Sequence, residues 1–458
     1  MNAGIPANYT KVKVRQLQRT LYLASKANPK RHFHALYDKL YREDIMRMAW
    51  IQVKANGGSA GVDGETIGYI IREYGENRLI EECRKALRNK TYRTSPVRRQ
   101  EIPKGDGKMR PLGIPTVRDR VVQMAAKLVV EPIFEADFHD CSFGFRPKRS
   151  QHDALRRIRE SVKRRKVNWV VDVDISGYFD NIPHDKLMKM VEQRISDRRI
   201  LKLIRLWLKA GVMKDGERYE TEIGSPQGGV ISPLLANLYL HYLDTVWMKQ
   251  FNHLGTLVRY ADDLVILCRH KEQAMEAIRV LKSVFEKLEL RMNTSKSKLV
   301  NLWAGKEGFD FLGHTHRRMP YWGRNGERLY YLRSYPSKKA MKKMRMRVRE
   351  ELAPRQHLGS SLNDLIKRMN PIIQGWRNYY AKVDPSMANQ FLAKIDWHIR
   401  MRMRLWWNKK HKSRKAGDVE LLALLPIAGL KTVSTWGNRT VQGEERRKAV
   451  CGKTARTV

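Results

Sequence analysis

Residues 257–268, LVRYADDLVILC, set two adjacent acids inside a run that otherwise suits the interior of a β-sheet. The aliphatic residues on both sides predict two buried strands joined by a tight turn, with Asp262 and Asp263 at that turn. Neighbouring carboxylates that are taken out of water without partners are strongly destabilising. Divalent metal ions or basic side chains could each neutralise the negative charge of these carboxylates.

The overall charge indicates a polyanionic partner. Lys and Arg number 90 against 47 Asp and Glu, which gives a formal net charge of +43 and a pI near 10.3. An excess of this size along the whole chain is typical of nucleic-acid binders and disfavours an ordinary basic surface. Hydrophobic residues make up 42% of the 458 residues, which excludes wholesale disorder and allows two or three domains.

Several other classes of protein are disfavoured. The 4 cysteines stand singly, with no Cys-x-x-Cys pair, so we expect neither a disulfide framework nor a zinc site. No apolar run approaches the roughly 18 residues of a membrane span, so no membrane partner is expected. The segment before Asp38 lacks acids, which fits an organellar transit peptide or a basic RNA-contacting extension. We favour the extension because helical periodicity begins almost at once.

The pattern of elements divides the chain into regions. Residues 12–54 have helical spacing, residues 97–115 read as two extended segments around a Gly turn, and residues 168–187 start as a strand and end as a helix. Beyond about residue 335 the pattern is helical and more basic. The predicted regions are a basic N-terminal extension (1–90), a mixed α/β region (91–315), a helical basic domain (335–415) and a basic polar tail (416–458).

Asp174 is the strongest candidate for a third carboxylate beside Asp262 and Asp263. It lies in the apolar run VVDVDI (170–175), and Asp172 shares its face by strand alternation. Oxygen ligands at adjoining strand ends suit two Mg²⁺ ions, with a polyanionic substrate completing their coordination. The alternative is that the acids pair with Arg or Lys; we favour metal because two separate strands each deliver an acid to a strand end. The reaction that such a metal site implies is phosphoryl transfer. The residues alone do not distinguish a polymerase from a nuclease.

A series of motifs resembles one family. YADD (260–263) in a strand-turn-strand is similar to the active-site signature of reverse transcriptases. The accompanying motifs, in chain order, are IPKGDGKMRPLGIP, SFGFRPKRS, VDVDISGYFDNIPHDKL, GSPQGGVISPLLANLYL, MNTSKSKLV and FDFLG. Together they resemble the bacterial group II intron reverse transcriptases, or maturases, over residues 35–315. PIIQGWRNYY (371–380) resembles the intron-maturase domain that doubles as the polymerase thumb.

The resemblance implies a fold and a function. The fold is an α/β (α+β) right-hand fingers and palm followed by a helical thumb/maturase domain. The function is that of an RNA-directed DNA polymerase, a nucleotidyltransferase, which also binds intron RNA to assist splicing and mobility. Two alternatives stay open: a standalone or domesticated reverse transcriptase serving phage defence, CRISPR adaptation or hypervariation, and a protein that is mainly an RNA-binding splicing cofactor.

The resemblance also implies cofactors, partners and a location. The cofactor is Mg²⁺, with two ions at the site and Mn²⁺ as a substitute. The partners are intron RNA, an RNA template with a DNA primer, target DNA and deoxynucleoside triphosphates. We expect a ribonucleoprotein in the cytoplasm of a bacterium.

Residue by residue, the resemblance assigns the chemistry to two strand ends. Asp174, Asp262 and Asp263 are the implied catalytic residues and metal ligands, and Ile175 joins them as a metal ligand. Phe179 matches the aromatic gate that faces the sugar of the incoming nucleotide, where a flat ring excludes a ribose 2′-hydroxyl. The alternative for Phe179 is a core aromatic.

Further residues match contacts to the incoming nucleotide. Lys104 and Arg110 match fingers residues that grip the triphosphate, and their place beside a Gly turn suits a mobile anion clamp; two ordinary exposed cations are the alternative. Gln227 in SPQGG matches the residue that packs on the nucleotide. Lys296 matches the position of a general acid for the leaving pyrophosphate, with Lys298 as its rival.

The C-terminal region interleaves aromatic residues with cations. Its predicted RNA-binding residues are Arg400, Arg402, Arg404, Lys409 and Lys410. The aromatic residues either stack on unpaired bases or form a core, and we expect the core role for most of Trp376, Tyr380, Trp397 and Trp406. The tail from residue 416 lacks the paired cysteines of a His-Asn-His endonuclease, which predicts no intrinsic DNA cleavage.

Overall fold

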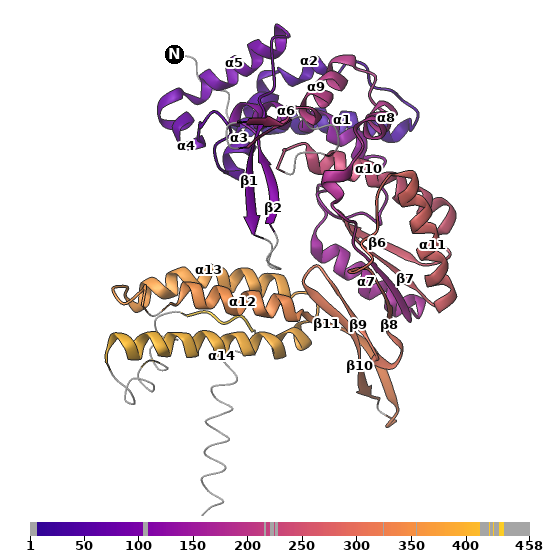
Figure 1. Ribbon diagram of the computed structural model, residues 1–458, viewed down its shortest axis with the longest axis vertical. Helices are drawn as coiled ribbons and strands as arrows, with labels where there is room; N and C mark the ends of the chain where they lie inside the picture. Colours follow the sequence, from indigo (N-terminus) through magenta and orange to yellow (C-terminus); the bar gives the residue numbers. More distant parts are fainter. Residues whose placement is uncertain are drawn as a thin grey trace, which may run out of the picture. The chain divides into compact units, whose positions relative to one another are not determined.

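The chain forms a mixed α/β structure with a helical C-terminal region, as predicted (Figure 1). The computed structural model describes residues 7–103, 109–214, 217–219, 224, 228–323, 325–353, 355–412, 421, 425 and 430–434. The chain divides into two compact units. The first unit comprises Met1–Ser150, Val173–Ile266 and Met275–Lys298, and the second comprises Gln151–Asp172, Leu267–Ala274 and Leu299–Val458.

Helices make up most of the first unit. They are α1 (Ala7–Ala27), α2 (Tyr37–Leu40), α3 (Glu43–Asn56), α4 (Ile67–Tyr69), the π-helical η1 (Ile70–Tyr74), α5 (Glu76–Arg88), α6 (Val117–Glu135), the 3₁₀-helical η2 (Tyr178–Asn181), α8 (His184–Glu192), α9 (Arg198–Leu208), α10 (Ser232–Val246), the π-helical η3 (Trp247–Phe251) and most of α11 (Lys271–Lys287). Helix α6 lies at the centre, because its small and aliphatic residues cover every face and a helix of that kind is buried all round. Helix α1 packs on α6, where Gln18 and Ser25 donate to the carbonyls of Leu128 and Ile133.

Two four-stranded sheets contain the strands that carry the predicted motifs. One has the order β2-β1-β4-β5, from β1 (Val97–Pro103), β2 (Met109–Ile114), β4 (Val212–Lys214) and β5 (Glu217–Tyr219). The antiparallel pairing of β1 with β2 confirms the hairpin expected around residues 97–115. The other has the order β6-β7-β3-β8, from β3 (Trp169–Val173), β6 (Thr256–Tyr260), β7 (Asp263–Cys268) and β8 (Lys298–Asn301). Strands β6 and β7 are buried along most of their length, as their aliphatic sequence predicts.

The second unit combines a three-stranded sheet with helices. Its remaining elements are α7 (Gln151–Arg165), the 3₁₀-helical η4 (Trp303–Gly305), β9 (Gly308–Phe311), β10 (His314–Trp322), β11 (Arg328–Pro336), α12 (Lys338–Glu351), α13 (Leu362–Tyr380) and α14 (Pro385–Lys410). The sheet has the order β11-β10-β9. The sequence patterns do not predict the long β10–β11 hairpin, because arginine and aromatic residues interrupt the apolar alternation there.

Helices α12, α13 and α14 enclose an apolar core of their own. Trp406 is fully buried in it and donates to the carbonyl of His357 at 2.7 Å, while Trp376 and Tyr380 pack partly buried against it. These three residues confirm the core role predicted for most of the four aromatics, and Trp397, which is 62% exposed, is the exception. The large apolar residues that α14 buries are Leu392, Ile395, Ile399, Met403 and Trp406. Position 397 falls on the opposite side of the helix. Among the described helices, none combines the length and apolar character that a membrane crossing needs.

Candidate active site

The two adjacent acids lie at the turn between β6 and β7, as predicted. Strand β6 ends at Tyr260, Ala261 adopts a φ of +57°, and β7 begins at Asp263. Positive φ is uncommon for a residue other than glycine, so the turn depends on support from its surroundings. Asp263 is exposed and Asp262 is partly exposed, so a substrate can reach both carboxylates.

Asp174 follows β3 and lies level with Asp262. The N–H of Asn168, just before β3, donates to the carbonyl of Cys268, at the end of β7, at 3.0 Å. Strands β3 and β7 are neighbours in the sheet, and this bond shows that they pair antiparallel. In a parallel pairing, β3 would lie opposite residues that follow Cys268 and are no longer part of β7. Six residues on from Asn168 and six back from Cys268 are Asp174 and Asp262. The register therefore brings acids from two strands to one edge of the sheet.

The segment after Asp174 is also close to Asp262. Tyr178 is fully buried, and its hydroxyl donates to the carbonyl of Ala236. Burial raises the pKa of the Tyr178 hydroxyl well above its ordinary value; the Arg259 guanidinium opposes this shift and the Asp262 carboxylate adds to it. The electrostatic influence of Asp262 on Tyr178 agrees with the strand register.

A turn before β8 holds Asp174 in place. The Asn293 amide donates to Asp174 Oδ2 at 3.1 Å, and the Asn293 N–H donates to the Asp174 carbonyl at 2.8 Å. Ser297 Oγ accepts from the Asp174 N–H at 3.2 Å. Lys296 Nζ lies 3.4 Å from Asp174 Oδ2, although the Lys296 side chain is 61% exposed. Lys296 is therefore placed beside a predicted catalytic acid, whereas its rival Lys298 is an exposed residue that begins β8.

Ile175 can offer only its backbone to a metal ion, because its side chain is buried. Ile175 forms an antiparallel bridge with Met292. The two bonds of this bridge run from Ser176 N–H to the Arg291 carbonyl and from Asn293 N–H to the Asp174 carbonyl. In such a pair the Ile175 carbonyl points away from the 291–293 segment.

The donor set suits a hard divalent cation. Carboxylates from two strand ends, with the Ile175 carbonyl, are oxygen ligands of the kind that Mg²⁺ prefers. Within the described ranges, no three or more His, Cys, Asp or Glu side chains gather closely enough to hold a metal ion by themselves. Mg²⁺ in phosphoryl-transfer enzymes commonly binds one or two carboxylates together with substrate phosphates. The residues therefore fit metal ions that the substrate helps to hold.

Phe179 lies in the short helix η2, five residues after Asp174. It is partly buried and packs edge-to-face on Tyr178, with ring centroids 5.4 Å apart. The fully buried aromatic of this pair is Tyr178, so part of the Phe179 ring stays accessible.

Phe179→Val is expected to raise the incorporation of ribonucleotides by at least about tenfold relative to deoxynucleotides, because valine leaves room for a 2′-hydroxyl and a factor of ten corresponds to only 1.4 kcal/mol. The measurement is primer extension with each nucleotide type under single-turnover conditions. Phe179→Tyr, which keeps the ring, is the matched control. Unchanged discrimination in Phe179→Val would identify the ring as a packing residue only.

The predicted nucleotide contacts of the fingers are only partly described. Lys104 and Gln227 lie outside the described residues, and Arg110 has a described backbone, opposite Ile102 in the β1–β2 hairpin, but its side chain lies outside them. Gly228 has a φ of +120°, and a Cβ there would lie 2.4 Å from the carbonyl oxygen of Gly113. Only glycine allows this approach, which places Gly228 against the end of β2.

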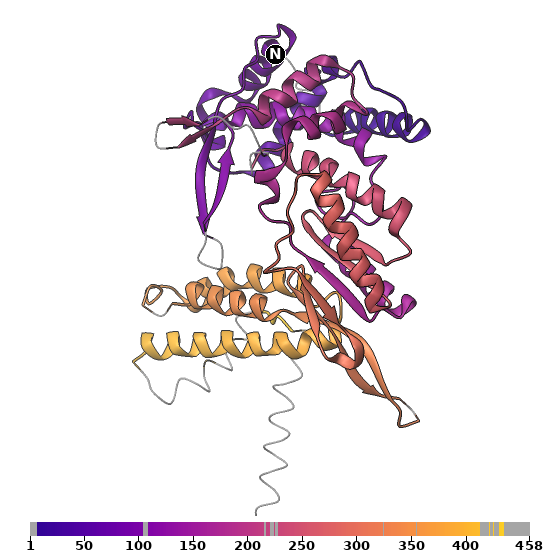
Figure 2. The same ribbon diagram turned by 45° about the vertical axis from the view of Figure 1, so that its right-hand side comes forward.

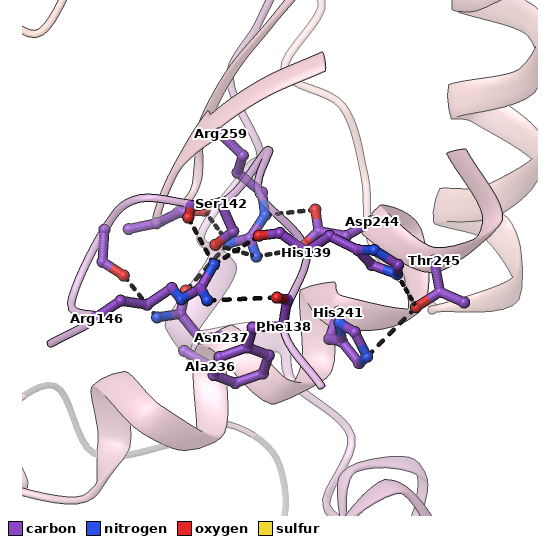
Figure 3. A network of polar contacts seen from close by, with 12 residues as sticks. Phe138, His139, Ser142, Arg146, Ala236, Asn237, His241, Asp244, Thr245 and Arg259 are labelled. Atoms are coloured by element: carbon purple, nitrogen blue, oxygen red, sulfur yellow. Dashed lines mark hydrogen bonds and ion pairs between the residues drawn. The ribbon is translucent and has the colours of Figure 1, made fainter. Parts of the chain in front are cut away.

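Arg259, which the sequence analysis overlooked, supports the acidic turn (Figure 3). Its side chain is fully buried and pairs with Asp244 of α10, with Nε 2.8 Å from Oδ1. The same guanidinium donates to the Ala261 carbonyl at 2.9 Å, to Asn237 Oδ1 at 3.1 Å and to Ser142 Oγ at 2.8 Å. The sequence did contain a signal for this network, because Arg259 lies within an aliphatic strand. A buried charge at such a position requires an ion-pair partner and hydrogen-bond acceptors.

The SFGFRPKRS loop packs directly against the turn. A Cβ at Gly144 would lie 2.4 Å from the backbone nitrogen of Ala261, and Asn237 donates to the Gly144 carbonyl at 2.6 Å. Arg146 holds the loop from the other side by donating to the carbonyls of His139 and Ser142 at 2.6 and 2.8 Å (Figure 3). The motif therefore acts as a structural support for the acids.

Comparison with known proteins identifies two family domains along the chain. Residues 102–316 match the family described as reverse transcriptase (RNA-dependent DNA polymerase), and residues 341–420 match the group II intron maturase-specific domain. The chain is 35% identical over 341 residues to Protein YkfC of Escherichia coli, which covers 66% of this chain and 87% of that protein. It is 40% identical over 215 residues to the group II intron-encoded protein LtrA of Lactococcus lactis. That match covers 46% of this chain and 35% of LtrA.

Solved structures are more distant. A telomerase from Candida albicans in complex with a fragment of telomeric RNA matches 74% of this chain and 62% of its own, with a TM-score of 0.40 and 14% identity. The family assignment depends instead on the two matched domains and on the relative that is covered over most of its length. The chain belongs to the group II intron reverse transcriptases, in which an RNA-directed DNA polymerase is followed by a maturase domain.

Proposed function

We propose that the chain copies RNA into DNA at Asp174, Asp262 and Asp263 with two Mg²⁺ ions, and that it binds the RNA of a group II intron through its C-terminal helices. The observation that carries the polymerase site is the strand register, which places Asp174 level with Asp262 at an accessible sheet edge. The substrates are a primed RNA template and deoxynucleoside triphosphates. Intron RNA and target DNA are the partners proposed for splicing and mobility.

Each residue of the site has a role in the proposed reaction. The three carboxylates and the Ile175 carbonyl would hold the metal ions, and bound Mg²⁺ would activate the primer hydroxyl and neutralise charge on the leaving pyrophosphate. Lys296, whose Nζ lies 3.4 Å from Asp174 Oδ2, is proposed as the general acid for the leaving pyrophosphate. Lys104, Arg110 and Gln227 are proposed to grip the triphosphate and pack on the nucleotide, and Phe179 to exclude a 2′-hydroxyl.

Cations gather between α12 and α14 in the second unit, which supports an RNA-binding role for this region. Burial lowers the pKa of His398, and the charges of Arg349, Arg402 and Arg345 lower it further. The charges of three arginines, two from α12 and one from α14, therefore act on one histidine. A local excess of positive charge of this kind attracts a polyanion, and an RNA phosphate would neutralise part of it.

The predicted RNA-binding residues of α14 lie on two sides of the helix. Arg400 and Arg404 are one turn apart, and Arg402 projects from the opposite side, toward the α12 arginines. Lys410 donates to the carbonyl of Ser360 and lies 5.2 Å from the Trp406 ring centroid, and these contacts give it a structural role as well. Lys409 is exposed.

The combined change Arg400→Ala, Arg402→Ala and Arg404→Ala is expected to weaken intron binding and to flatten its salt dependence. A plot of log affinity against log salt concentration has a negative slope, and each lost phosphate contact reduces its steepness by about 0.7–0.9. The measurement is a filter-binding salt titration, with Arg402→Ala and Arg404→Ala made singly to separate the two sides of α14.

The matched control is the double variant Asp262→Ala, Asp263→Ala, which should still bind the intron and support splicing, because the intron RNA performs that chemistry itself. A splicing assay run beside the titration checks this division. A full salt slope in the arginine variant, or loss of splicing in the acid variant, would show that the two functions are not separated in this way.

A further inference from the structure

The far end of the β10–β11 hairpin exposes an unusual group of large aromatic side chains. Tyr321, Trp322 and Tyr331 are 59%, 67% and 50% exposed. The hairpin extends away from helices α12–α14 of its own unit (Figures 1 and 2). Burying such rings is strongly favourable, so a cluster of exposed ones marks a binding surface.

The three rings lie near the turn end of the hairpin and project from both of its faces. Tyr321 and Tyr331 share one face by strand alternation, and their ring centroids are 5.8 Å apart in an edge-to-face arrangement. Trp322 projects from the other face, directly opposite Arg328 in the register. We call these three aromatic residues, together with Arg328, the aromatic tip.

The charge of the hairpin fits an anionic ligand. Residues 314–336 contain five arginines and a single acid, Glu327. At the tip, the Arg328 guanidinium lies 5.4 Å from the centroid of the Tyr330 ring, where it is held by a cation–π contact and remains exposed. Aromatic rings beside exposed arginine are suited to unpaired nucleotides, whose bases stack on the rings while the phosphates meet the guanidinium.

The middle of the hairpin is firmly attached within its own unit. Arg318 of β10 donates to Asn168 Oδ1 at 2.9 Å and to the Val167 carbonyl at 2.8 Å. One register position away on β11, Arg333 forms an ion pair with Asp384 at 3.0 Å. A rigid support lowers the entropy lost when a flexible strand binds, so the tip is a preorganised surface.

We infer that the aromatic tip is a stacking site for unpaired nucleotides of RNA. The inference deepens the proposed function, because it assigns recognition of single-stranded segments to the hairpin and leaves duplex and phosphate contacts to the basic helices. A base-paired helix buries the faces of its bases and cannot stack on the tip. The site therefore distinguishes unpaired from paired RNA.

The test is direct binding of a fluorescein-labelled 20-nucleotide oligouridylate and of a duplex of the same length, followed by anisotropy at fixed salt. Tyr321→Ala, Trp322→Ala and Tyr331→Ala in one variant are expected to weaken oligouridylate binding by at least about tenfold, since each lost stack lowers affinity by about fivefold or more and three rings are removed. Duplex affinity should stay within about twofold. The corresponding triple phenylalanine variant keeps the rings and should retain oligouridylate binding.

Two further measurements make the outcome decisive. Tyr69→Ala, which removes an exposed ring from the first unit, is the matched control and should bind like the wild type. Oligouridylate containing 4-thiouridine should crosslink on irradiation to the peptide that carries Tyr321 and Trp322. Equal oligouridylate affinity in the alanine variant, equal losses for both RNAs, or crosslinks confined to other peptides would each overturn the inference. Failure of the wild type to bind any RNA would instead contradict the proposed function.

Discussion

Asp262→Ala is expected to lower RNA-directed primer extension by at least ~10³-fold, or about 4 kcal/mol of transition-state stabilisation, while the protein stays folded. The loss would follow from removing one of the proposed oxygen ligands at the sheet edge where β3 and β7 meet. Asp262 is partly exposed, so its removal leaves no large cavity in the core. The measurement is single-turnover extension of a DNA primer on an RNA template, beside thermal unfolding of the same preparation.

Two control variants separate the loss of a ligand from a general loss of charge. Asp262→Asn keeps the shape of the side chain and should be nearly as inactive, since a neutral amide is a poor substitute for a metal-binding carboxylate. Asp185→Ala removes an exposed acid from the first turn of α8 and should remain close to wild-type activity. If Asp262→Ala keeps a tenth or more of the wild-type rate, the metal-ligand assignment is wrong.

Arg259→Ala is expected to destabilise the first unit by about 3–5 kcal/mol, because it leaves the Asp244 carboxylate buried without its partner. The variant also removes the guanidinium that donates to the Ala261 carbonyl at the acidic turn. Urea unfolding followed by circular dichroism measures the loss. Arg205→Ala, which breaks the exposed pair with Glu192, is the matched control and should change stability by less than about 1 kcal/mol.

A second pair of variants distinguishes positioning of the turn from stability alone. Arg259→Met combined with Asp244→Leu removes both charges and should regain much of the stability, yet it cannot restore the bond to Ala261. Arg259→Lys keeps a charge but cannot contact Asp244, Asn237 and Ala261 together. Both are expected to extend primers at least ~10-fold more slowly than wild type while they bind template and primer normally. Wild-type extension rates in both would restrict Arg259 to a purely structural role.

The sequence is most informative about the site where its signals are local. Asp174 and Asp262 each end or begin an aliphatic run, and one strand is enough to show that a carboxylate is out of place there. Their alignment depends on the pairing of β3 with β7, which no single segment specifies. The resemblance to known motifs supplied that relation in advance.

Features that depend on distant segments could not be predicted. The surroundings of Arg259 come from Ser142, Asn237 and Asp244, which are far apart in the sequence. The β10–β11 hairpin was overlooked because its exposed aromatic residues obscure the alternation that marks a half-buried strand. Average burial could not identify which of the four C-terminal aromatics is the exception, and only the helical phase of α14 shows that Trp397 faces solvent.

The close approach of Gly144 to Ala261 has a consequence for motion. The backbone of the 141–146 loop is bonded to β6 on both sides of Ser142, through the pairs of Arg259 with Cys141 and Phe143. The loop therefore cannot move away from β6 without breaking the hydrogen bonds that support the acidic turn. We expect the loop and the turn to open together as one cooperative segment. Slow fluctuations of Asp262 and Asp263 are thus expected to depend on contacts of a loop that lies far from β6 in the sequence.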